Sequence, residues 1–126
     1  KVKEAMATSA EISISHKRFG MFLCYDALRA LERARVIPAG GMRCSETFSS
    51  SAQRIERGCA LRFTLKDGAF PSGDVQATWR ALQQAFPFLQ CAHVHVSGAY
   101  QGCILDYLKP TQCQGNCRLS ERGAND

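Results

Sequence analysis

Two histidines stand two residues apart in the segment His93-Val94-His95, and both carry groups that can do chemistry. Alternate side chains of a β-strand point to the same face, so a strand here would place the two imidazoles side by side. Imidazole binds metals and transfers protons near neutral pH. Cys91 lies two residues earlier and would share that face. His93, His95 and Cys91 are therefore candidate metal ligands.

The His-apolar-His pattern resembles that of the nucleophilic-tyrosine endonucleases of replication and transposition (the HUH family), and Phe63-Thr64-Leu65 resembles that family's first strand motif. The resemblance implies a ferredoxin-like fold, a divalent metal held by His93 and His95, and a tyrosine that attacks a phosphodiester. It covers these few positions only. The family's tyrosine sits on a later helix, whereas Tyr107 is expected on the next strand, and no acidic third ligand is evident.

A larger set of polar side chains falls at alternate strand positions. The alternation assigns to one open face of the sheet Ser13, Ser15, Arg43, Ser45, Thr47, Arg62, Thr64, Cys91, His93, His95 and Ser97. The opposite set is apolar and is expected to pack under helices: Ile12, Ile14, Met42, Cys44, Leu61, Phe63, Val94 and Val96. Guanidinium groups suit phosphate and carboxylate contacts. The candidate ligand-binding residues are Arg43, Arg62, His93, His95, Ser15 and Ser97.

Periodicity and turn residues place the elements. Period-2 alternation predicts strands over 11–15, 42–48 and 59–65, with 52–57 either a loop or one helical turn. Helical spacing predicts a helix over 21–36 and a second one capped by Ser72 or Asp74 and ended by Pro87. Further strands are expected over 89–97 and 103–108, with a turn over 98–102.

This order, β-α-β-β-α-β-β, is typical of an α+β protein. We predict a ferredoxin-like two-layer sandwich, with helices on one face of a mostly antiparallel sheet. A chain of 126 residues is about one domain's worth, so we expect a single domain over 1–126. Residues 1–5 are interpreted as an expression-vector remnant, and 110–126 as a polar C-terminal extension.

Charge and cysteine content bear on partners and compartment. The formal net charge is +5, and residues 1–66 hold twelve basic against six acidic side chains, which favours an anionic partner. Seven cysteines form no even framework, and several fall in apolar periodic segments, where a thiol fills space as a small hydrophobe. No apolar run is long enough to span a bilayer. We therefore predict a cytoplasmic protein without a membrane partner.

The main hypothesis is a small binding protein, without a cofactor, that holds an anionic ligand or nucleic acid through the polar face or an oligomer cleft lined by it. The first alternative is a metal-dependent phosphodiesterase or nuclease that uses His93 and His95. The second is a structural homo-oligomer, with a homodimer as the expected form. We expect binding rather than catalysis.

Overall fold

The computed structural model describes residues 8–15, 23–36, 41–50, 55–66 and 70–109. The interpretations of 1–5 and 110–126 fall outside the described residues. Within them the element order is β1 (Ser9–Ser15), α1 (Leu23–Arg33), β2 (Met42–Ser50), β3 (Ile55–Thr64), α2 (Gly73–Ala85), β4 (His93–Val96), β5 (Tyr100–Cys103) and α3 (Ile104–Leu108). The protein is α+β, as predicted.

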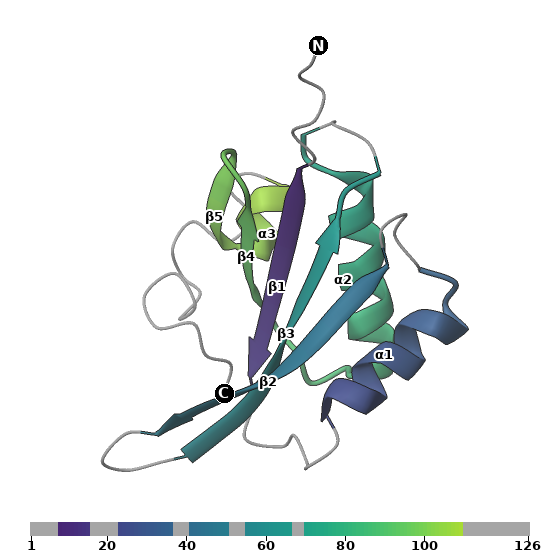
Figure 1. Ribbon diagram of the computed structural model, residues 1–126, viewed down its shortest axis with the longest axis vertical. Coiled ribbons are helices and arrows are strands. Elements are labelled where there is room, and N and C mark those ends of the chain that lie inside the picture. Colours follow the sequence, from purple (N-terminus) through teal and green to yellow (C-terminus); the bar gives the residue numbers. More distant parts are fainter. Residues whose placement is uncertain (1–7, 16–22, 37–40, 51–54, 67–69, 110–126) are drawn as a thin grey trace.

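The described strands form one sheet in the order β2-β3-β1-β4-β5, and every neighbouring pair is antiparallel. Helices α1 and α2 lie side by side on one face of this sheet, and α3 packs against β4 and β5 (Figure 1). No helix of the described segments is long and apolar enough to cross a membrane.

The core lies between the sheet and the helices. On β1, Ile12 and Ile14 are at most 1% exposed, while their neighbours Glu11 and Ser13 are only half-buried. The same alternation fills the core from β3 and β4, and α2 adds an apolar stripe. The buried residues from these elements include Leu61, Phe63, Val94, Val96, Val75, Trp79 and Leu82. The predicted inward and outward sets are confirmed along the strands, except at Cys91, which was assigned to the open face but lies ahead of β4 and is buried.

Helix α2 begins where the sequence predicts. The side chain of Ser72 accepts a hydrogen bond from the backbone N–H of Asp74 at 3.1 Å, which satisfies one of the N–H groups left without a helical partner. Ser72 also donates its own backbone N–H to the hydroxyl of Tyr107 at 2.7 Å. Tyr107 thereby links α3 to the start of α2.

One predicted loop is a strand. Residues 52–57 were expected to form a loop or a helical turn, but 55–57 open β3 and pair with 48–50 at the end of β2. The local sequence there has no clear strand period. The hydrogen bonds of the hairpin partner extend the strand beyond the segment that alternation marks, because tertiary pairing outweighs weak local preference.

The segment after α2 also differs from prediction. A strand was expected over 89–97, but only β4 within that range is a strand. A turn was expected over 98–102, but β5 begins at Tyr100. The segment 103–108 was expected to be a strand, but helix α3 occupies most of it. Gly98, at φ +73°, allows the tight turn between β4 and β5. Ile104 and Tyr107 are both buried, and residues three apart share a face of a helix but not of a strand.

The Tyr107 hydroxyl provides a test of this packing. We expect Tyr107→Phe to lower the free energy of unfolding by about 1–3 kcal/mol, because the buried N–H of Ser72 loses its acceptor. Urea denaturation measures this. Tyr25→Phe is the matched control, since Tyr25 is 58% exposed and its loss of a hydroxyl should change stability little. Equal effects of the two substitutions would contradict a structural role for the buried bond.

Candidate functional site

A single row of polar residues crosses the open face of the sheet, opposite the helices. The strand register aligns Arg43 on β2 with Arg62 on β3, Arg62 with Glu11 on β1, and Glu11 with His95 on β4. We call these four residues the charged row. It contains two arginines that the sequence nominated and a glutamate that it did not.

Glu11 divides the charged row into two parts. Its carboxylate accepts a hydrogen bond from one terminal nitrogen of Arg62 at 3.0 Å, and this ion pair is partly exposed, with Arg62 67% accessible. One N–H group of the guanidinium is used, so the others can still reach a ligand. Neighbouring strands are about 4.8 Å apart, so Arg43 and His95 stand on strands about 14 Å apart.

The arginine end of the charged row carries a hollow of about 230 Å³. Arg43, Arg62, Ser9, Thr64, Gly41 and Phe63 line it. Two arginines and two hydroxyl-bearing residues thus line one hollow, and none of the described residues that line it carries a carboxylate. We call this place the arginine hollow. Its chemistry suits an anion that accepts several hydrogen bonds, such as a phosphate.

The other predicted ligand-binding residues are spread over the same face. Ser97 hydrogen-bonds through its hydroxyl to the hydroxyl of Ser9, at 3.1 Å, and so adjoins the arginine hollow. Ser15 lies at the far end of β1, opposite Gly58. His93 and His95 belong to the other side of Glu11. The sequence grouped six residues into one site, whereas the structure brings together only Arg43, Arg62 and Ser97 of these, with Ser9 added.

His93 lies next to His95 on β4 and opposite Ser13. Partial burial lowers the pKa of His93 below its ordinary value of 6.5, and the charge of His95 lowers it further, while the carboxylate of Glu11 acts in the opposite direction. The neutral imidazole is therefore the dominant form of His93 at neutral pH. This is the form that binds metals and accepts protons.

Two groups nominated for chemistry are engaged elsewhere. Cys91 is buried ahead of β4 and is disulfide-bonded, so its sulfur is not available as a thiolate ligand. Because disulfides are rare in reducing compartments, this bond does not support the predicted cytoplasmic location. Tyr107, the tyrosine considered as a nucleophile, is 2% exposed, and its hydroxyl accepts the Ser72 N–H. It faces the helical layer rather than the histidines.

The chain was compared with known protein families, curated proteins and solved structures. No match was found.

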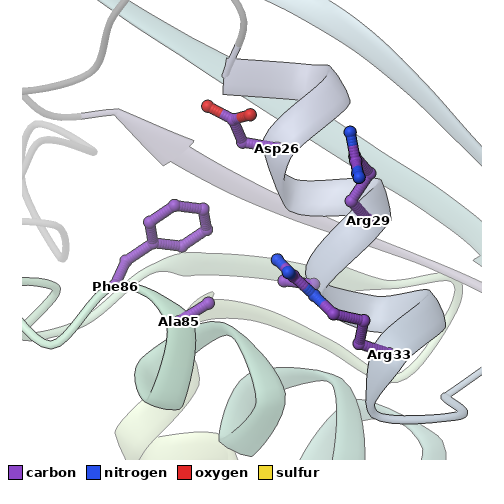
Figure 2. Close-up of a pocket in the computed structure, with 6 residues that line it drawn as sticks. Asp26, Arg29, Arg33, Ala85 and Phe86 are labelled. Carbon is purple, nitrogen blue, oxygen red and sulfur yellow. The ribbon is translucent and has the colours of Figure 1, made fainter.

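A second hollow, of about 300 Å³, lies in the helical layer between α1 and α2. Figure 2 shows Asp26 and Arg33 projecting from α1 toward the side where Ala85, at the end of α2, and the following Phe86 lie. Arg29 stacks on the ring of Tyr25, with its guanidinium carbon 5.2 Å from the ring centroid. The carboxylate of Asp26 offsets the basic residues here. A carboxylate thus lines this hollow directly, whereas the described lining of the arginine hollow contains none.

Three cysteines converge at the other side of the sheet, which the sequence did not reveal. Cys24 on α1, Cys44 on β2 and Cys59 on β3 have sulfur atoms within 4.8 Å of one another. Above all, the hydrogen bond with Cys59 lowers the pKa of Cys44 to about 7. Burial raises the pKa of Cys24 to about 12. The hydrogen bond that the Cys59 thiol donates to Cys44 raises the pKa of Cys59. Cys44 is therefore the thiol of this cluster that loses its proton most easily.

The sequence contained part of the signal for this thiol cluster. Cys44 belongs to the predicted inward set, and Cys24 lies on the apolar stripe of the first helix. Cys59 lies at the same alternate positions of its strand as the buried Leu61 and Phe63. What alternation does not provide is the register of β2 against β3 and the position of α1 over them. Glu11 was missed for the same reason, since its place between Arg62 and His95 depends on pairing.

The surroundings of His93 predict how its titration responds to substitution. Replacing His95 by Gln should raise the titration midpoint of His93, because a neighbouring positive charge is removed. Replacing Glu11 by Gln should lower it, because a stabilising negative charge is removed. Proton NMR of the imidazole C–H groups against pH measures both shifts. A midpoint that moves the same way in both variants would contradict this placement.

Proposed function

We propose that this protein binds a small phosphorylated ligand in the arginine hollow. The observation that carries the proposal is the pairing of Arg43 directly opposite Arg62 inside a concave, hydroxyl-lined part of the open face. Both side chains are exposed and can turn toward a common anion. Arginine donates in a fixed fork that matches phosphate oxygens, so two of them could hold one phosphoryl group from two sides.

The pairing costs the free protein stability. Like charges directly opposite each other on an antiparallel pair destabilise it. The bond from Arg62 to Glu11 offsets part of the repulsion but leaves Arg43 without a described ion pair. A bound anion between the guanidinium groups would turn the repulsion into two attractions. Residues that lower stability in this way are often kept for binding.

The dimensions of the hollow favour a small ligand over a nucleic acid. A volume of about 230 Å³ lies below the range of about 300–1,000 Å³ usual for larger ligands. Single-stranded nucleic acids are mostly held by stacking bases on exposed aromatic rings. The large exposed aromatic residues of the described chain are Tyr25 on α1 and Phe70 beside Tyr107, neither of them on the open face.

As a finer fold assignment we propose a ferredoxin-like arrangement with β5 added at its edge. Support comes from the partial order β2-β3-β1-β4, in which β3 lies between the two strands that α1 connects. This is the split β-α-β pattern of that fold. A homo-oligomer and a cytoplasmic location remain predictions.

A metal-dependent nuclease is the second candidate, and the position of Glu11 favours it. Glu11 lies opposite His95 and next to His93 in the register, so it could supply the acidic ligand that the sequence lacked. The carboxylate would first have to leave Arg62. Cleavage of a single-stranded oligonucleotide that requires Mn²⁺ and disappears in His95→Ala would favour this candidate over simple binding.

The binding proposal is tested by calorimetric titration with inorganic phosphate and inorganic pyrophosphate at low salt. We expect Arg43→Gln and Arg62→Gln each to weaken pyrophosphate binding about 10- to 100-fold, since a charged hydrogen bond contributes about 1.5–3 kcal/mol. Added salt should weaken binding to the unsubstituted protein. Without ligand, Arg43→Gln should be at least as stable as the unsubstituted protein, because it relieves the repulsion from Arg62.

Arg80→Gln is the matched control, because Arg80 is exposed on α2, in the helical layer, and the substitution removes the same charge. The proposal fails if Arg80→Gln weakens pyrophosphate binding as much as Arg43→Gln does. A single-stranded oligonucleotide is titrated in parallel. Binding of the oligonucleotide without binding of pyrophosphate would overturn the small-ligand proposal in favour of a nucleic-acid surface.

A further inference from the structure

The thiol cluster of Cys24, Cys44 and Cys59 brings three elements of the chain to one point. Cys24 lies in the first turn of α1, Cys44 on the edge strand β2, and Cys59 on β3. Their sulfur atoms all lie within 4.8 Å of one another. Among the described residues, this is the one group of three or more potential metal-ligating side chains that meets so closely.

The spacing fits a metal with thiolate ligands. Zinc binds cysteine sulfur at about 2.3 Å in tetrahedral geometry, which sets neighbouring sulfurs about 3.8 Å apart. The cluster therefore needs sulfur movements of about 1 Å at most to reach this geometry, a shift that side-chain rotation can supply. Cys59 is fully buried, while Cys24 and Cys44 are half-buried, so an ion can enter from the surface.

A fourth ligand is close at hand. Glu46 lies two residues after Cys44 on β2, on the same face of the strand, and stands opposite Cys59 in the register. It is exposed, and its charge acts on both Cys24 and Cys44. Zinc accepts carboxylate oxygen or water as well as sulfur, so Glu46 or a water molecule can complete the tetrahedron.

We propose that Cys24, Cys44 and Cys59 bind one Zn²⁺ ion, which ties helix α1 to strands β2 and β3. The thiols that still carry protons release them to the solvent as the ion binds, and no bond other than the sulfur–metal contacts forms. When Glu46 is the fourth ligand beside the three cysteines, all four positions are filled by the protein, as in structural zinc sites. It lies on the face opposite the arginine hollow and is independent of the proposed ligand binding.

Titration of the metal-free protein with Co²⁺, under argon and without reductant so that the Cys91 disulfide is kept, tests the site. We expect one Co²⁺ per chain, with intense sulfur-to-metal charge-transfer absorption, and full displacement by Zn²⁺. Cys24→Ser and Cys44→Ser should each weaken Zn²⁺ binding by about 100-fold or more, since loss of even an outer partner of a ligand costs about 10- to 100-fold. Zn²⁺ should also raise the melting temperature of the unsubstituted protein but not of Cys44→Ser.

Cys103→Ser is the matched control, because Cys103 is a buried cysteine outside the cluster. It should bind Zn²⁺ as the unsubstituted protein does. Circular dichroism checks that the variants fold, and the half-buried positions Cys24 and Cys44 decide the outcome if Cys59→Ser does not fold. Absence of the charge-transfer band, or equal loss of Zn²⁺ binding in Cys44→Ser and Cys103→Ser, would overturn the proposal. Arg43→Gln should leave Zn²⁺ binding unchanged, so this result is separable from ligand binding.

Discussion

The alternation of side chains along the central strand β1 is the constraint on which the rest of the structure depends. β1 pairs with β3 on one side and β4 on the other, and it sends Ile12 and Ile14 under the helices while Glu11 and Ser13 face outward. A slip of one residue in either pairing would bury a carboxylate and expose two isoleucines. Burying each isoleucine contributes about 1.5–3 kcal/mol, so the register is strongly specified.

That register, together with the pairing of β2 with β3 and the position of α1, produces two chemically different surfaces. On the outward side Glu11 stands between Arg62 and His95, which separates the arginine hollow from the histidines. On the inward side the pairing of β2 with β3 brings Cys44 near Cys59, and α1 adds Cys24. The same sheet thus carries the proposed anion site on one face and the proposed zinc site on the other.

The sequence predicted well which face of the sheet a side chain occupies, but it predicted poorly which residues lie opposite one another on neighbouring strands. Period-2 patterns suffice to place Arg43 and Arg62 outward and Leu61 inward, because side-chain direction is a local property of a strand. Which residue lies opposite Arg62 is not local, since it depends on the pairing of strands far apart in the chain. For that reason Glu11 and the thiol cluster were missed. The start of β3, the helix α3 and the disulfide of Cys91 likewise depend on tertiary partners rather than on local pattern.

The central claim is that the outward face binds an anion at Arg43 and Arg62 rather than elsewhere on this basic chain. The most direct measurement is a map of backbone and arginine side-chain NMR shifts during titration with inorganic pyrophosphate. We expect the largest shifts at Arg43, Arg62 and Thr64, with saturation at a common affinity. Shifts concentrated on α1 around Arg29 and Arg33, or small unsaturable shifts at every arginine, would contradict the claim.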